Sequence, residues 1–351
     1  IKLVKREVVK VITPGTAIDA QLLDSREPVY VAAICSSRDT YGLAMLDISN
    51  GDFVTTQHSG PNAWTETNET IAGYQPKEFI FPQSLQQLVS DSTSYTSTKL
   101  QPSMLEADHN AAHLVSGNAT PLDDAFFDPH DSETLLKSHF QVRDLSGFGL
   151  DLNTEAIRAA GACLRYALET QRASANHISE IRFLEARDCL VLDAITLRNL
   201  EILESRAGER RLTLFGVIDE TVTGMGSRLL RSWITRPSIK MSEIQTRLSA
   251  VSELIDSILR QKLTHLLKNV ADLDRLVGKI NLDSATPRDL IGLNRSLKQG
   301  PEINAFLSDA KSLLLQVLSE NIFALPGIRD LIDRSITDEP PINLADGGTI
   351  R

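Results

Sequence analysis

The sequence has few aromatic residues and no long apolar run. Phe, Trp and Tyr make up 5% of the 351 residues, so Leu, Ile, Ala and Val must supply most of the core. A core of this kind is typical of helix-on-helix packing. No stretch is long enough to cross a bilayer, and no signal peptide is recognisable. We therefore expect a soluble, cytoplasmic protein that does not associate with membranes.

Cysteine is scarce as well. Cys35, Cys163 and Cys189 are odd in number, lie among apolar residues, and show no CxxC or Cys/His ligand spacing. This pattern predicts buried thiols in a reducing compartment and excludes a disulfide framework. The seven histidines form no HExxH pair, so no metal site is predicted from them.

Positive charge is in deficit, because the net charge is −10. Such a surface repels nucleic-acid phosphates, and DNA binding would need a local basic patch. Each basic run that could form a patch is more typical of an ordinary solvated face. These runs are Lys2, Lys5, Arg6 and Lys10, and later Arg228, Arg231 and Arg236.

The length predicts two or three domains, and the first half predicts an α/β domain that extends to about residue 148. Three apolar, β-branched runs cover residues 29–37, 41–49 and 52–56, and they predict adjacent antiparallel strands. Asn50-Gly51 separates the second and third runs and predicts a type I′ hairpin turn. A helix over 64–74, a strand over 78–82 and a helix over 84–89 are expected to follow.

The second half predicts helices. Apolar residues at helical spacing mark residues 153–171, a small hairpin is expected over 181–193, and further helices follow. Ser242 with Gln245 predicts a capping box, and Thr286-Pro287 predicts another helix start. The remaining predicted helices are 194–203, 225–235, 242–256, 259–268, 272–281 and 287–298.

Gly224-Met225-Gly226 resembles part of a phosphate-binding loop. However, Leu229 replaces the third glycine of GxGxxG, and the Gly-Lys-Ser/Thr of a P-loop is missing. The pattern therefore favours a helix entrance, with Leu229, Leu230 and Trp233 directed inward.

Asp47 and Asp52 offer the one paired-carboxylate arrangement that could hold Mg²⁺ for nuclease chemistry. Both flank the predicted hairpin turn, where Asp is favoured for its local hydrogen bonds, and no further acidic cluster lies nearby. The turn interpretation is therefore favoured over the nuclease. With GxSxG also absent, the sequence predicts no catalytic, cofactor-binding or metal-binding residues.

Seven motifs, taken in order, resemble the MutS family of DNA mismatch-repair proteins. The motifs are REVVKVITPGT, YGLAMLDISNGDF, VRDLSGFGL, LRYALETQ, LDAITLRNLEIL, LFGVIDETVTGMGSRLLRSWITRPSI and DEPPINLADGGTI. The resemblance implies a multidomain fold, in which an α/β ribonuclease H-like connector precedes a mainly α-helical core or lever domain. The implied parts are the end of the mismatch-reading domain (1–20), the connector (21–148), the helical core (149–342) and the start of the clamp (343–351).

The resemblance also implies a role without catalysis. The family's ATP- and Mg²⁺-dependent ATPase and its mismatch-reading Phe-x-Glu are not present, and Phe183-Leu184-Glu185 is interpreted as a chance match. The segment would link mismatched double-stranded DNA to the ATPase in a parent protein that acts as a dimer and recruits MutL. A metal-dependent ribonuclease H-like nuclease and a helical scaffold unrelated to repair stay open as alternatives.

Two sets of site residues follow from the resemblance. A MutL-docking helix is implied at Ser132, Glu133, Thr134, Leu135 and His139. An ordinary amphipathic helix with Leu136 and Phe140 inward explains the same stretch equally well.

The second set is the junction between the connector and the helical core, implied at Arg143, Asp144, Gly147 and Gly149. The resemblance also places the returning half of the core helices outside this chain. We therefore expect exposed apolar stripes, and with them self-association or raised mobility over residues 286–335.

Overall fold

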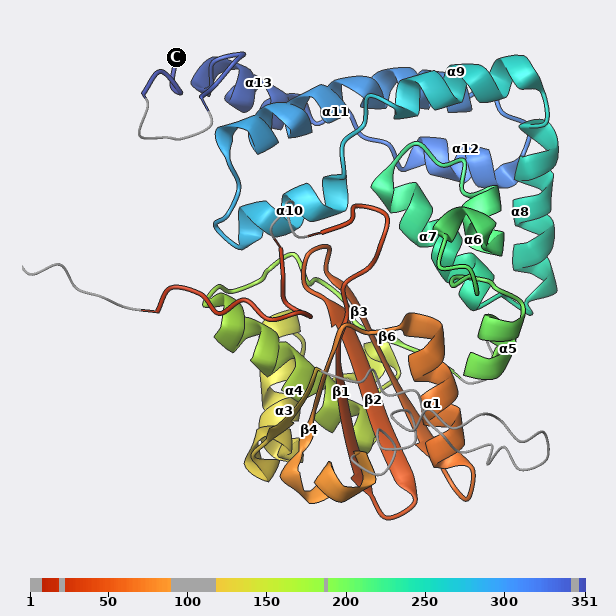
Figure 1. The fold of residues 1–351 in the computed structure, drawn as a ribbon. Coiled ribbons are helices and arrows are strands. Elements are labelled where there is room, and N and C mark those ends of the chain that lie inside the picture. Colours follow the sequence, from red (N-terminus) through yellow and green to blue (C-terminus); the bar gives the residue numbers. More distant parts are fainter. Residues whose placement is uncertain (1–7, 19–22, 90–117, 186–188, 342–346) are drawn as a thin grey trace, which may run out of the picture. The chain divides into compact units, whose positions relative to one another are not determined.

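The computed structural model describes residues 8–18, 23–89, 118–185, 189–341 and 347–351. The chain forms two compact units (Figure 1). Unit 1 comprises residues 1–24, 28–186 and 191–216, and unit 2 comprises residues 25–27, 187–190 and 217–351. Unit 1 contains a mixed sheet with helices, and unit 2 is helical, so the multidomain α/β and α-helical fold class is confirmed at this level.

Unit 1 is built on a six-stranded sheet with the strand order β5-β4-β1-β2-β3-β6. The first three strands are antiparallel neighbours, as predicted, and β4, β5 and β6 pair in parallel with β1, β4 and β3. The strands are β1 (Val31–Ser37), β2 (Thr40–Asp47), β3 (Asp52–Ser59), β4 (Glu78–Pro82), β5 (Ala119–Leu122) and β6 (Arg182–Phe183).

The β2–β3 hairpin forms, but its predicted turn type is wrong. Asp47 pairs with Asp52, which leaves a four-residue loop over 48–51. Only Gly51 in this loop has a positive φ, at 81°, whereas a type I′ turn requires Asn50 to share that conformation. The Asp47 carbonyl accepts the Gly51 amide at 2.8 Å and closes the loop instead.

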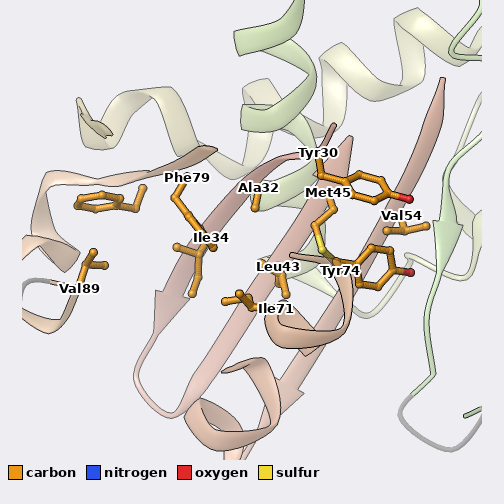
Figure 2. Close-up of a cluster of buried hydrophobic side chains, with 11 residues drawn as sticks. Tyr30, Ala32, Ile34, Leu43, Met45, Val54, Ile71, Tyr74, Phe79 and Val89 are labelled. Carbon is orange, nitrogen blue, oxygen red and sulfur yellow. The ribbon is translucent and has the colours of Figure 1, made fainter. Parts of the chain in front are cut away.

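Both faces of the sheet are covered. Helix α1 (Ala63–Tyr74) lies over β2 and β3 on one face (Figure 1). Beneath it is a buried cluster to which alternate residues of the central strands contribute (Figure 2). The cluster comprises Tyr30, Ala32, Ile34, Leu43, Met45, Val54, Ile71, Tyr74, Phe79, Phe81 and Val89.

The opposite face packs on α4 (Thr154–Gln171), and α3 (Pro129–Phe140) lies against α4. The Thr55 hydroxyl donates to the Ala156 carbonyl at 3.1 Å, and the Cys163 thiol lies 3.5 Å from the Val31 carbonyl. Cys35 and Cys163 are fully buried, and burial raises the pKa of both thiols. The prediction of buried thiols is confirmed for these two, whereas Cys189 is partly exposed.

The hairpin expected over 181–193 is wrong for the residues that the structure describes. Strand β6 pairs in parallel with β3, and the Leu184 amide donates to the Thr55 carbonyl at 2.8 Å. Cys189 forms an antiparallel bridge with Ser238 rather than with β6. The two halves of residues 181–193 therefore pair with distant segments, β3 and Ser238, and not with each other. The helix that follows, α5 (Ala194–Asn199), is shorter than predicted.

Four of the helices of unit 2, α8, α9, α11 and α12, contribute to a second apolar cluster, formed by Ala250, Leu266, Ile303, Leu307 and Leu315. Helix α6 (Leu214–Ile218) spans the boundary between the units. The others are α7 (Gly224–Thr235), α8 (Met241–Glu253), α9 (Ser257–Leu267), α10 (Leu273–Asn281), α11 (Pro287–Leu307), α12 (Leu313–Glu320) and α13 (Pro326–Ser335). No helix in the described part of the chain combines the length and hydropathy of a membrane span.

Helix starts were predicted with mixed success. Thr286 caps α11 and forms a capping box with Asp289, as the Thr286-Pro287 pattern indicated. The capping box expected at Ser242 is wrong, because Lys240 is the N-cap of α8 and makes no side-chain cap. Glu243 instead accepts the Ser238 hydroxyl at 2.6 Å. Helix α11 also continues through Pro301 to Leu307, nine residues beyond its predicted end at 298.

Candidate docking helix and domain junction

Helix α3 carries the residues expected to dock a partner. Asp128 caps its first turn by accepting the His130 and Asp131 amides at 2.9 Å, and Pro129 occupies the first helical position. Leu136 is fully buried against unit 1, and Phe140 contacts Phe148 with ring centroids 5.1 Å apart. The amphipathic pattern with these two residues inward is therefore confirmed.

The five predicted docking residues do not share one exposed face. Ser132 is fully buried, its Cβ lies against Gly161 of α4, and its hydroxyl has no hydrogen-bond partner among the residues that the structure describes. Glu133 forms an ion pair with Lys137 at 2.5 Å. Thr134 is exposed and Leu135 is partly exposed. The side chains available to a partner are thus Glu133, Thr134 and Leu135.

His139, the fifth residue, is used inside unit 1. Its Nε2 lies 2.8 Å from the Ile178 carbonyl, so this nitrogen must carry a proton and donate. Burial lowers the pKa of His139 and outweighs the opposite effect of the hydrogen bond. His177 is held in the same way by the Ile48 carbonyl at 2.7 Å, and burial lowers its pKa too. The neutral His139 fastens α3 to the loop that contains Ile178.

The junction residues lie in the turns between α3 and α4. Arg143, Asp144, Gly147 and Gly149 are all exposed, and Gly149 has a φ of 75°. The Asp144 carboxylate accepts the Ser146 hydroxyl and amide, and these hydrogen bonds lower its pKa.

The apolar residues of the same motif anchor these turns. Leu145 and Leu150 are buried. Helix α4, which begins at Thr154, five residues after the expected first residue of the core (149), packs on the sheet of unit 1. The turns therefore lead into a helix of unit 1.

Hydrogen bonds occupy the Asp47 and Asp52 carboxylates. Asp47 is fully buried and accepts the Val29 and Ser49 amides at 3.0 Å and the Ser49 hydroxyl at 2.6 Å. Asp52 accepts the Tyr30 hydroxyl and pairs with Arg182 at 2.6 Å. Within the described residues, no group of three His, Cys, Asp or Glu side chains could hold a metal ion. The geometry supports the turn interpretation for Asp47, which binds Ser49 in the loop, whereas the Asp52 carboxylate binds Tyr30 and Arg182 outside it.

The GMGSR stretch opens α7, as predicted. The Thr223 hydroxyl accepts the Gly226 amide at 3.1 Å and caps the helix. Leu229 was expected to face inward, but it is 51% exposed, and Arg228 is buried in its place. The Arg228 guanidinium binds both oxygens of Asp272, at 2.6 and 2.9 Å.

Arg228 and Arg275 also hold the segment Ser25–Glu27 within unit 2. Arg228 donates to the Ser25 carbonyl at 2.9 Å, and Arg275 donates to the Glu27 carbonyl at 2.6 Å. Burial by itself would raise the pKa of Asp272, but the hydrogen bonds and charge of Arg228 lower it. Sequence reasoning favoured a solvated face for the basic run that includes Arg228, and the buried ion pair shows that this interpretation is wrong for Arg228.

Sequence reasoning missed Asp272 as a functional residue. It is the N-cap of α10 and is followed two positions later by Asp274. Its partner lies 44 residues away, so no local spacing connects the two. The other proposed basic run begins with Lys2, Lys5 and Arg6, which lie outside the described residues.

Comparisons with known proteins assign both parts of the chain. The family model described as MutS domain II matches residues 29–179, and MutS domain III matches residues 195–351. Relatives called DNA mismatch repair protein MutS align with nearly the whole chain. The protein of Solibacter usitatus is 37% identical over 100% of this chain and 38% of its own length. The protein of Pelotomaculum thermopropionicum is 38% identical over 99% of this chain and 39% of its own length.

The chain thus spans well under half the length of these relatives. The two family models follow one another along the sequence and together cover most of it. The chain belongs to the MutS family and carries domains II and III of that family.

Proposed function

We propose that this chain is the non-catalytic middle segment of a MutS-type mismatch-repair protein. The observation that carries the proposal is the succession of MutS domains II and III along a chain that aligns end to end with mismatch-repair relatives. These relatives are more than twice as long. We assign the ATPase, with its ATP and Mg²⁺, and the mismatch-reading residues to the remainder of the parent protein.

In this proposal, residues 1–20 end the mismatch-reading domain, 21–148 form the connector, 149–342 the helical core and 343–351 the start of the clamp. A ribonuclease H-like connector is supported by the mixed sheet with helices on both faces. The packing of α4 on that sheet favours a connector that extends past residue 148. The parent protein would act in the cytoplasm, as a dimer, on mismatched double-stranded DNA.

The helical part would link DNA binding to the ATPase. Coupling between distant sites needs elements that move as rigid bodies between discrete arrangements. The buried Arg228–Asp272 pair joins α7 to the start of α10, and the apolar cluster joins α8, α9, α11 and α12. These contacts support helices that shift together rather than bend separately.

For MutL docking we propose the exposed side of α3, centred on Thr134 and Leu135. Their side chains are accessible, whereas Leu136, Ser132 and His139 hold the helix in place. A helix fixed on its inner face presents its outer residues without a large ordering cost, which favours recognition.

A binding assay of the chain with the N-terminal domain of a MutL-type protein tests this surface. The double variant Thr134→Arg and Leu135→Glu places charge and bulk at the centre of the proposed contact. We expect its affinity to fall by at least about tenfold, as for a central interface residue. Gln245→Arg, at an exposed position of α8, is the matched control and should bind like the unmodified chain.

Equal loss in the control, or unchanged binding in the α3 variant, would contradict docking at this helix. Failure of the unmodified chain to bind any MutL-type domain would favour the unrelated helical scaffold. The nuclease alternative predicts Mg²⁺-dependent cleavage that Asp47→Asn abolishes. The hydrogen bonds on the Asp47 carboxylate argue against that result.

A further inference from the structure

Residues 11–16, which include the TPGT motif, are bound to unit 1 at several points. Their central feature is the carboxylate of Glu78, the first residue of β4, which is only 3% exposed. Its Oε2 accepts the Thr13 hydroxyl at 2.5 Å and the Gly15 amide at 2.9 Å. Its Oε1 accepts the Tyr166 hydroxyl of α4 at 2.6 Å.

A buried carboxylate is costly unless hydrogen-bond donors surround it. Two of the three donors to Glu78 come from the TPGT turn, and the third comes from α4. Burial and the bond to Glu78 raise the pKa of the Tyr166 phenol, so the phenol keeps its proton and donates. Glu78 therefore depends on the TPGT turn for most of its hydrogen bonding.

The turn is shaped for this contact. The Thr16 amide donates to the Thr13 carbonyl at 3.1 Å, and Pro14 occupies the second position, which its fixed φ favours. A Cβ on Gly15 would lie 2.8 Å from the Glu78 Cβ and 3.0 Å from the Val31 Cβ. Only glycine lets the main chain approach Glu78 this closely.

The end of α4 holds both sides of the turn. The Val11 amide donates to the Thr170 carbonyl at 2.8 Å, and the Gln171 side chain donates to the Thr16 carbonyl at 2.8 Å. Thr16, Ala17 and Ile18 are buried. The contacts thus come from two separate elements of unit 1, β4 and α4.

We propose that residues 11–16 are a strap that Glu78 latches onto unit 1, so that the chain enters this unit along one fixed path. Glu78 is the positioning residue of the latch, and Thr13 and Gly15 are its contacts. Residues 11–16 are then a rigid connection to unit 1 and not a flexible linker. Its use in transmitting position from a preceding mismatch-reading domain rests on the proposed function, whereas the latch itself does not.

Hydrogen–deuterium exchange of the whole chain, followed by mass spectrometry, tests the latch. The variant Thr13→Val keeps the shape of the side chain and removes its donor, and Glu78→Gln removes the charge. Thr40→Val is the matched control, because the Thr40 hydroxyl also donates to a side chain, that of Ser59, on an exposed part of unit 1.

We expect slow exchange of the Gly15 and Thr16 amides in the unmodified chain. It should become at least about tenfold faster in both latch variants, since a hydrogen bond to a charged group is lost. Peptides from β1 to β3 should keep their protection, and Thr40→Val should exchange like the unmodified chain. Tryptic cleavage after Lys10 should accelerate in the same two variants.

Rapid exchange of the Gly15 and Thr16 amides in the unmodified chain would overturn the proposal, and so would unchanged exchange of these amides in Thr13→Val. Thr13 is partly exposed and outside the sheet, so this variant remains decisive if Glu78→Gln fails to fold. Neither result depends on MutL, DNA or nucleotide, so a failed latch and a failed repair role are distinguishable.

Discussion

At Gly42 the main chain of β2 lies directly against the first turn of α4. A Cβ there would be 2.0 Å from the Glu155 carbonyl oxygen and 2.2 Å from its carbon. Both neighbours are backbone atoms, which cannot rotate away, so Gly42→Ala must separate α4 from the sheet. We expect a loss of about 3 kcal/mol in the free energy of unfolding, at the upper end for overpacked sites.

Urea denaturation of the whole chain, monitored by circular dichroism, measures this loss in the free energy of unfolding. Gly147→Ala is the matched control, because a Cβ at Gly147 meets nothing within 4 Å and its φ is not positive. Its stability should change by less than about 0.5 kcal/mol. Equal stability of Gly42→Ala and Gly147→Ala would contradict the close approach of β2 and α4.

At the scale of elements, one buried ion pair joins α7 to α10. The side chains of Arg228 and Asp272 are 7% and 18% exposed, and the contact is bidentate. Asp272→Asn removes the charge of the bidentate partner, so the buried guanidinium keeps a longer ion pair with Asp274, at 3.3 Å, whose side chain is 53% exposed. We expect unit 2 to lose about 2 kcal/mol, somewhat less than for a fully buried pair because Asp272 retains some contact with water.

Thermal unfolding of the chain reports this change. The pair of Arg351 with Asp338 is the control, since its side chains are 42% and 84% exposed. Asp338→Asn should leave the transition unmoved, because water and salt screen exposed pairs. A shift of the same size in both variants would show that burial does not distinguish the two pairs.

For the whole molecule, unit 2 exposes several large apolar side chains close together along the chain. Leu313, Phe323 and Leu331 are 66%, 68% and 51% exposed and lie on or beside α12 and α13. Exposed apolar residues in this number favour association. We expect light scattering to show a molar mass that rises with concentration, and Phe323→Ser with Leu313→Ser to reduce the rise.

The matched control is Leu152→Ser in unit 1, where the leucine side chain is 90% exposed. It should associate like the unmodified chain, because isolated apolar residues on a surface contribute little. A constant monomer mass over the whole concentration range would contradict the expectation of self-association.

Regular local patterns made much of the fold predictable. The antiparallel strands β1 to β3, the helix at 154–171 and the cap at Thr286 follow from apolar alternation, helical spacing and hydroxyl–proline chemistry. Seven ordered motifs were enough to identify the family, which the comparisons confirm. The docking and junction residues stay predictions, because their role depends on partners outside the chain.

The sequence by itself determined the class of each half, the strands that pair through short turns and the family, because these depend on neighbours a few residues apart. Only the tertiary structure decided the parallel pairing of β6 with β3, the burial of Arg228 against Asp272 and the binding of the TPGT turn to Glu78. Those contacts join residues that are far apart along the chain. Their free energy comes from burial and hydrogen bonding that no local periodicity records.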